Sequence, residues 1–143
     1  MGGVEVHPVD AGRWADLVEL FGPSGAYSAA VAPRTAYPRI LRSPALKPDD
    51  PADHAVWSVP CFFIRRDRRR AGVAGALLAA AVAHARAQGA TALEGYPVDT
   101  ASKMPPPADL YTGTIPLFTR AGFKQHRRPK TGRRVVMRRA LPA

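Results

Sequence analysis

Residues 59–78 read VPCFFIRRDRRRAGVAGALL, and this stretch decides the predicted fold. A short apolar strand ends near Ile64, a strongly basic turn follows, and Gly72 and Gly75 open a helix rich in Ala and Leu. The first-turn N–H groups of a helix have no acceptors within it, and the helix dipole adds partial positive charge there. Glycine lets a phosphate approach the backbone, and arginine donates to it bidentately. The stretch therefore predicts a pyrophosphate site, served by five arginines: Arg65, Arg66, Arg68, Arg69 and Arg70.

The chain is long enough for one domain, residues 1–143, with its own hydrophobic core. Hydrophobic residues make up 46% of it, which excludes disorder throughout. The formal net charge is +10 and the isoelectric point is about 10.8, so phosphates, nucleic acids and anionic surfaces are attracted. Arginine, alanine and proline are all abundant, and part of this charge reflects the codon bias of a GC-rich genome.

The single cysteine, Cys61, excludes an internal disulfide and a cysteine-rich zinc site. The four histidines show no metal-ligand spacing, so no metal is expected. The N-terminus lacks the basic and apolar regions of a signal peptide, and no apolar run reaches the ~20 residues that cross a bilayer. We expect a cytoplasmic protein without a membrane partner.

Hydrophobic periodicity and the Gly and Pro positions predict an α/β (α+β) fold. The nearly continuous apolar character of residues 55–64 is typical of a strand buried on both faces, in a parallel or mixed sheet. Other strands are expected at 4–9, 28–32, 91–96, 123–128 and 133–141, the last two as a hairpin. Helices are expected at 10–21, from Gly72 to Gln88 and at 115–120, with Pro-rich loops at 33–54, including one helical turn near 37–41, and 97–107.

Two motifs resemble those of the GNAT-type N-acetyltransferases. The acyl-CoA signature of that family, Q/R-x-x-G-x-G/A, is matched here by Arg69-Arg70-Ala71-Gly72-Val73-Ala74. A later signature, an aromatic residue, three residues and Gly-Phe, is matched by Phe118 and Gly122-Phe123. The resemblance covers roughly residues 56–141. It implies a mixed, mostly antiparallel sheet flanked by helices. The stretch 25–32 offers only one short strand where relatives have two long ones, so the N-terminal half is shortened or partly missing.

The resemblance also implies acetyl-CoA as co-substrate and direct attack of an amine on its thioester in a ternary complex. The main chain of the strand would pair with the pantetheine arm, and an N–H near Phe63 or Ile64 would stabilise the oxyanion. The cofactor-binding residues implied are Cys61, Phe62, Phe63, Ile64, Arg69, Arg70, Ala71, Gly72, Val73, Ala74, Gly75 and Phe118.

Glu94 is the expected catalytic base, with a structural carboxylate as the open alternative. Many relatives carry a Tyr at the position of Phe118 as the acid that protonates the CoA thiolate, and a phenyl ring cannot do this. Tyr111, seven residues earlier and two helical turns away, is the expected acid in its place. Thr112 and Thr114 are weaker candidates for the acid.

The acceptor is expected in a pocket shaped by the loops 33–54 and 97–109, with Tyr96 as a further lining residue. Asp99 and Asp109 are candidates for recognising a cationic acceptor. Small amines, aminoglycoside-like polyamines and a peptide N-terminus remain open. Many relatives dimerise, and a homodimer is also open.

Two other functions compete with acetyl transfer. A catalytically degenerate acyl-CoA-binding protein is consistent with Phe118. Nucleic-acid binding is suggested by the basic C-terminal hairpin, but no pair of aromatic residues for stacking on bases accompanies it. The hairpin's basic residues are Arg127, Arg128, Lys130, Arg133, Arg134, Arg138 and Arg139.

Overall fold

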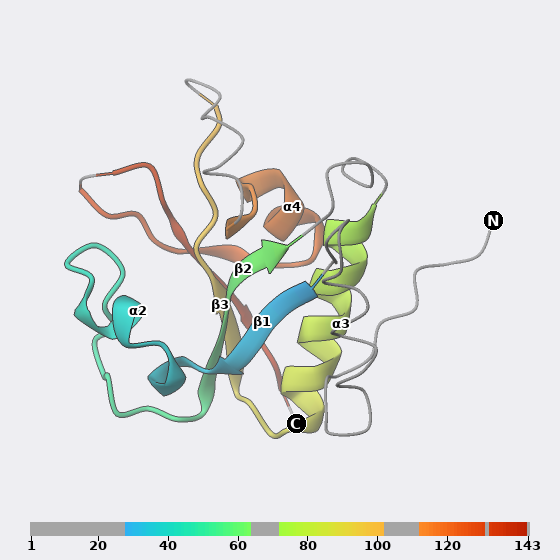
Figure 1. Ribbon diagram of the computed structural model, residues 1–143, viewed down its shortest axis with the longest axis horizontal. Coiled ribbons are helices and arrows are strands. Elements are labelled where there is room, and N and C mark those ends of the chain that lie inside the picture. The colour runs from blue at the N-terminus through green and yellow to red at the C-terminus, as the bar shows by residue number, and fades with distance from the viewer. Residues whose placement is uncertain (1–27, 64–71, 102–111, 131, 143) are drawn as a thin grey trace, which may run out of the picture.

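The computed structural model describes residues 28–63, 72–101, 112–130 and 132–142 (Figure 1). The strand expected at 4–9 and the helix expected at 10–21 lie outside these residues. So do Ile64, Arg69, Arg70 and Ala71 of the predicted cofactor site, and Tyr111, the predicted acid.

The centre of the fold is a five-stranded sheet with the order β1-β2-β3-β5-β4. Its strands are β1 (Ser28–Pro33), β2 (Val56–Phe63), β3 (Ala92–Gly95), β4 (Lys124–Arg127) and β5 (Val136–Ala140). β2 and β3 run parallel, and every other neighbouring pair is antiparallel. The mixed, mostly antiparallel sheet predicted from the sequence is thereby confirmed.

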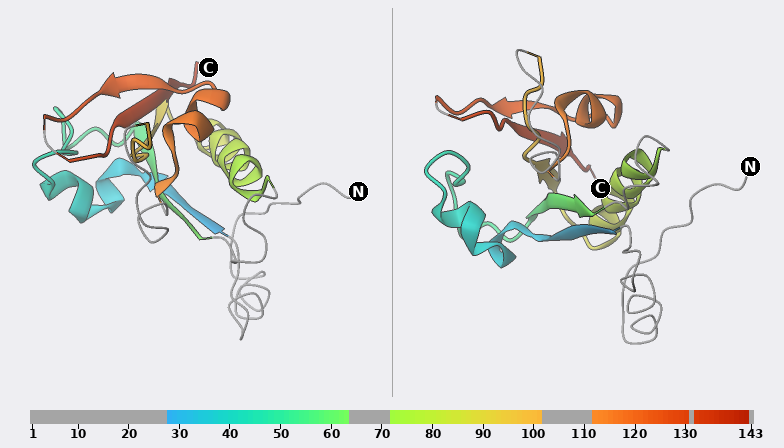
Figure 2. Two further views of the ribbon diagram at one scale, coloured as in Figure 1. Left: turned by 90° about the horizontal axis from the view of Figure 1, so that it is seen from above. Right: turned by 45° about the horizontal axis from the view of Figure 1, so that its top comes forward.

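Helices cover both faces of this sheet (Figure 2). η2 (Arg34–Ala36) and α2 (Pro38–Arg42) follow β1, α3 (Val73–Ala87) connects β2 to β3, and α4 (Ile115–Arg120) precedes the hairpin. α3 begins after Gly72 and is followed by Gly89, both at positive φ, as expected for the glycines at its ends. The Thr114 hydroxyl accepts from the Leu117 N–H at 3.4 Å and so caps α4.

Two hydrophobic clusters lie on opposite sides of the sheet. The larger one joins α3 and α4 to the sheet through residues such as Leu78, Leu93 and Phe118. The smaller one contains Ile40 of α2, Tyr96 and Val136. Successive strand residues point to opposite faces, so Leu93 enters the larger cluster while Glu94 points to the α2 side.

β2 contains one extra residue where it leaves β3. Along β1, Ala32 pairs with Ser58 but Ala30 pairs with Cys61, so three steps on β2 match two on β1. This bulge bends the strand and reverses its alternation. The ladder between β2 and β3 ends at the adjacent pair Val59–Gly95, and β2 continues along β1.

The predicted elements from residue 28 onward are confirmed, with small shifts at their ends. The loop at 33–54 begins with a 3-10 turn that the sequence did not indicate. Trp57 is only partly buried and meets His84 of α3 edge-on, with ring centroids 5.7 Å apart. Among the helices that the structure describes, none has the length and apolar character needed to cross a membrane.

Candidate functional site

The first candidate feature is the separation of β2 from β3. Beyond Val59, the residues Cys61 to Phe63 pair with β1 on one edge, and no described strand pairs with their other edge. Pro60 has no N–H to offer at the point of separation. Cys61, predicted to bind the cofactor, is half-buried, whereas Phe62 is buried in the larger cluster. The backbone edge is therefore the part of this segment that can receive an extended ligand.

The second feature is the N-terminus of α3, which follows β2. Gly72 has φ 81° and is exposed, and a β-carbon built at Gly72 or Gly75 would meet no atom of the described residues within 4 Å. Open space at two glycines of a helix N-terminus is the geometry that phosphate binding uses. Val73, between them, is buried and anchors the turn to the core, while Ala74 is half-buried.

Phe118 fills the space next to the separated strands. Its ring is fully buried and meets Phe62 and Phe123 edge-on, with centroids 6.1 Å and 4.9 Å away. A β-carbon at Gly113 would lie only 2.8 Å from the ring. A side chain without exposed surface supports the site from behind, so its burial does not favour the direct cofactor contact predicted for Phe118.

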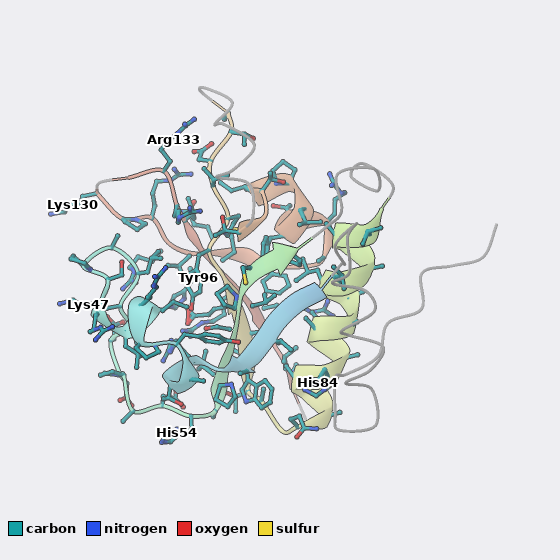
Figure 3. All side chains as sticks on the ribbon, in the orientation of Figure 1. Lys47, His54, His84, Tyr96, Lys130 and Arg133 are labelled. Atoms are coloured by element: carbon teal, nitrogen blue, oxygen red, sulfur yellow. The ribbon has the colours of Figure 1, made fainter. Side chains whose placement is uncertain are left out.

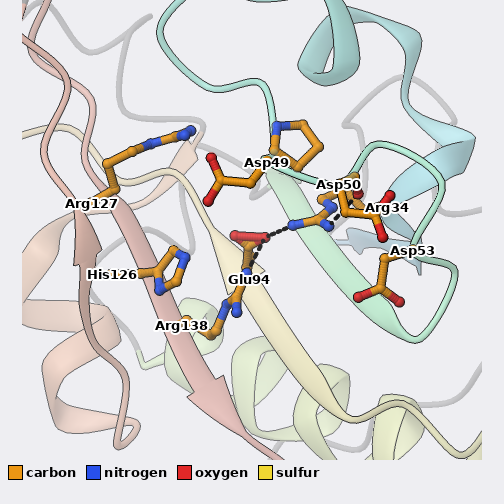
Figure 4. Close-up of a pocket in the computed structure, with 9 residues that line it drawn as sticks. Arg34, Asp49, Asp50, Asp53, Glu94, His126, Arg127 and Arg138 are labelled. Atoms are coloured by element: carbon orange, nitrogen blue, oxygen red, sulfur yellow. Dashed lines mark hydrogen bonds and ion pairs between the residues drawn. The ribbon is translucent and has the colours of Figure 1, made fainter.

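A pocket of about 200 Å³ opens on the α2 side of the sheet (Figure 4). It lies between the segment that precedes β2 and the hairpin formed by β4 and β5. Its lining is almost entirely charged: Arg34, Pro48, Asp49, Asp50, Asp53, Glu94, His126, Arg127 and Arg138. Five of these residues come from the loop 33–54 that was predicted to shape an acceptor pocket. Tyr96 and Asp99 are not among the residues that line it.

Glu94 lies at the centre of the pocket floor, bound by two arginines. Its Oε1 accepts from Arg34 Nη1 at 2.5 Å and lies 3.3 Å from Arg138 Nη2. The side chains of Arg34 and Glu94 are 5% and 4% exposed, so this is a buried ion pair. A second Arg34 nitrogen, Nη2, donates to the Asp50 carbonyl oxygen at 3.1 Å. Since its Oε1 is already committed to guanidinium groups, Glu94 is better suited to hold the arginines than to accept a proton from a substrate.

His126 of β4 is the side chain in the pocket best suited to accept a proton. Desolvation by the pocket wall, together with Arg138 and Arg127, holds the pKa of its imidazole below the usual value, while Glu94 and Asp49 act in the opposite direction. A depressed pKa keeps the ring neutral near pH 7, with one nitrogen able to accept a proton.

Tyr96 lies in the interior, next to the end of the β2–β3 ladder (Figure 3). Its hydroxyl is 2.7 Å from Ser58 Oγ, and both residues are buried. Burial raises the pKa of Tyr96 well above its usual value, with a smaller contribution from Glu94. Burial likewise raises the pKa of Tyr37 to about 12. Both phenols therefore stay protonated near neutral pH.

Thr112 and Thr114, the weaker candidates for an acid, have structural partners. The Thr112 hydroxyl is buried and accepts from Arg134 at 2.5 Å. Thr114 caps α4. Neither hydroxyl is placed as an acid in the described pocket.

The basic hairpin uses most of its arginines within the fold. Arg128 pairs with Asp99 at 2.9 Å, Arg139 donates to the Ala121 carbonyl at 2.8 Å, and Arg138 pairs with Glu94. Lys130 and Arg133 lie at the outer end of the hairpin (Figure 3). Because most of these arginines are bound within the fold, fewer of them are available to form a continuous cationic surface for nucleic acid.

Sequence reasoning missed Arg34, His126, Arg127 and Arg138 as members of one site. Arg34 lies in a Pro-rich segment 60 residues before Glu94, and nothing local marks it as buried. His126 has no ligand-like spacing to other residues. The usable signal was the predicted hairpin over 123–128 and 133–141, which places residues 127 and 138 within a sheet.

Within the described residues, no group of three or more His, Cys, Asp or Glu side chains is placed to hold a metal ion. No known protein-family model matches the chain, and no curated protein sequence matches it.

Proposed function

We propose that this chain is a GNAT-type, acetyl-CoA-dependent N-acetyltransferase, with an amine acceptor bound in the charged pocket. The observation that carries the proposal is the parallel pair β2–β3, which separates after Val59 and Gly95 beside the glycine-opened N-terminus of α3. The open edge of β2 and the helix N-terminus proposed to bind phosphate therefore follow each other along the chain. These are the two recognition elements that the resemblance implies for acetyl-CoA.

In this proposal the β2 edge from Cys61 to Phe63 hydrogen-bonds the amide-bearing pantetheine arm as an added strand would. The pyrophosphate meets the N–H groups at Gly72 to Gly75. The thioester then reaches the end of the β2–β3 ladder, one residue from Glu94 on the pocket floor.

The acceptor nitrogen must lose a proton before it attacks. Neutral His126 accepts that proton across the pocket through water, and the neutral amine attacks the thioester carbon. As the C–N bond forms, the C–S bond breaks to release the CoA thiolate. The nitrogen loses its second proton as the amide forms, which balances the proton that the thiolate takes up. Glu94 orients Arg34 and Arg138 around the acceptor. Tyr111 remains the proposed donor to the thiolate.

The proposal is tested by calorimetric titration of acetyl-CoA into the wild-type chain and the variants Gly75→Glu, Gly75→Gln and Ala83→Glu, each at low and high salt. Gly75 is helical and faces open space, so Glu there fits the first turn and suits the helix dipole. It nevertheless brings negative charge to the phosphate site.

We expect micromolar binding by the wild type that persists at high salt, and at least a ten-fold loss in Gly75→Glu. Gly75→Gln tests bulk without charge, and Ala83→Glu adds the same charge further along α3 at an exposed position. Equal affinity of Gly75→Glu and Ala83→Glu, or binding that disappears with salt in the wild type, would contradict the acyl-CoA site.

A second candidate, an acyl-CoA-binding protein without turnover, is favoured by the complete burial of Phe118, which also lacks the hydroxyl group. Thiol release from acetyl-CoA in the presence of an amine panel separates the two. Binding without any release above the buffer rate supports the second candidate.

A further inference from the structure

The pocket has two walls of opposite charge. Asp50 and Asp53, from the segment before β2, lie on one side. The cationic Arg127 of β4 lies on the other, beside the neutral His126 (Figure 4). Glu94 and its two arginines lie between the walls.

The carboxylates of the acidic wall retain free acceptor capacity. Asp50 Oδ1 accepts from the Ala52 N–H at 3.1 Å, and Asp53 Oδ1 accepts from the Ala55 N–H at 2.9 Å. Within the described parts of the chain, neither carboxylate forms a salt bridge, and the Asp49 carboxylate has no hydrogen-bond or salt-bridge partner. Two carboxylates at one side of the pocket, Asp50 and Asp53, with no salt-bridge partner among the described residues, attract an ammonium group.

The guanidinium groups on the other side also have unused donors. Arg127 makes one long hydrogen bond, from Nη2 to the Ala45 carbonyl at 3.4 Å. The Nε atoms of Arg34, Arg127 and Arg138 are buried and have no hydrogen-bond partner among the described residues. The Arg34 side chain is 5% exposed, and it reaches the pocket centre (Figure 4). Because a guanidinium offers five N–H donors, these groups are matched by a carboxylate.

We propose that the pocket binds a small zwitterionic amine of the amino-acid class, with its carboxylate on Arg127 and Arg138 and its ammonium on Asp50 and Asp53. A diamine would bring a second positive charge to the arginines, and a dicarboxylate would bring a second negative charge to the aspartates. At about 200 Å³ the pocket is smaller than the roughly 300–1,000 Å³ typical of drug-sized ligands, which disfavours an aminoglycoside. The bound amine is the acetyl acceptor if the proposed function holds, so this role rests on that function.

The test compares three four-carbon probes that differ only in their end groups: 4-aminobutanoate, 1,4-diaminobutane and succinate. Each is titrated calorimetrically into the full chain without acetyl-CoA, together with glycine and 6-aminohexanoate to vary the distance between the charges. We expect the zwitterions to bind, with at least one of them ten-fold tighter than the diamine and the dicarboxylate.

Two variants then test which wall binds the carboxylate and which binds the ammonium group. Arg127→Gln is expected to weaken 4-aminobutanoate and succinate by about ten-fold or more and to leave 1,4-diaminobutane unaffected. Asp53→Asn, which keeps the Oδ1 acceptor for Ala55, is expected to weaken 4-aminobutanoate and 1,4-diaminobutane and to leave succinate unaffected. Arg128→Gln and Asp99→Asn remove matched charges from a pair outside the pocket and serve as controls.

Tighter binding of the diamine or the dicarboxylate than of every zwitterion would overturn the proposal, as would equal effects of Arg127→Gln and Arg128→Gln. Binding of acetyl-CoA without any zwitterion binding would also overturn it, while the proposed function would stand. Zwitterion binding without acetyl-CoA binding would support the proposed ligand of the pocket and contradict the proposed acetyl transfer.

Discussion

The ring of Phe118 lies directly against the backbone of Gly95, at the point where β2 and β3 separate, and leaves no room for a β-carbon there. Gly95 is a core position of β3, and the glycine is needed because of this close approach. The aromatic ring thus replaces a side chain of the strand and fills the space behind the open edge of β2.

Gly95→Ala is therefore expected to destabilise the fold by about 1–3 kcal/mol, because the buried ring has no free volume into which to move. Urea unfolding followed by circular dichroism measures this. Gly75→Ala is the matched control: it is helical with open space, and we expect a gain of about 0.5–1 kcal/mol. Equal unfolding midpoints for Gly95→Ala and wild type would contradict the close approach.

Glu94→Gln tests whether the buried carboxylate holds the pocket together. Removing its charge leaves Arg34 buried without a counter-ion, and the expected loss is about 3–5 kcal/mol in the free energy of unfolding. Asp99→Asn breaks the exposed pair with Arg128 and should cost less than about 1 kcal/mol. If Glu94→Gln keeps full stability but loses turnover, the original assignment of Glu94 as catalytic base gains support instead.

Tyr96→Phe leaves the fully buried Ser58 hydroxyl without its partner and should cost about 1–3 kcal/mol. Ser58→Ala has the converse effect on the Tyr96 hydroxyl. The double variant removes both polar groups, so its loss should be smaller than the sum of the single losses. Strictly additive losses in the double-mutant cycle would show that the two hydroxyls do not interact.

His126 should titrate below the usual histidine range, as measured from its imidazole resonances by nuclear magnetic resonance. Desolvation has the largest effect, Arg138 of β5 and Arg127 of β4 add to it, and Glu94 of β3 and Asp49 act against it. Glu94→Gln, in any fraction that stays folded, should lower the pKa of His126 further. A midpoint at or above that of an unstructured histidine peptide would contradict this environment.

The same shift has a consequence for stability. A histidine whose pKa is lower in the folded state binds fewer protons there than in the unfolded chain, so stability rises with pH across that window. The free energy of unfolding should fall as the pH drops below the ordinary histidine pKa. His126→Gln should show a smaller decline over this range in parallel urea titrations.

The order of elements from β1 to β5 could be predicted because each is delimited by local signals. Gly72 and Gly89 flank α3, Gly122 follows α4, and the apolar run of β2 predicted a strand buried on both faces in a parallel or mixed sheet. Such signals lie within a few residues of the element they define, so a single sequence reveals them.

The charged side chains of the pocket could not be predicted as one site, because their interaction partners lie far away in the sequence. Arg34 appears in the sequence as one more arginine of a basic chain, yet its burial depends on Glu94. Glu94 looked like an available base for the same reason, although two guanidinium groups already bind it. The bulge in β2 was missed although Pro60 lies within it, and a proline inside a strand is typical of a bulge.

The position of Glu94 also bears on the order of assembly. β5 is the last strand along the chain, yet it lies between β3 and β4, so β3 is an outer strand until β5 arrives. Until then the Glu94 carboxylate lacks its partner on β5, Arg138. A charge on an unpaired strand discourages pairing with another molecule. Once Arg138 docks opposite Glu94, the same carboxylate favours the correct strand. We therefore expect Glu94 to disfavour mispairing of β3 before β5 is in place.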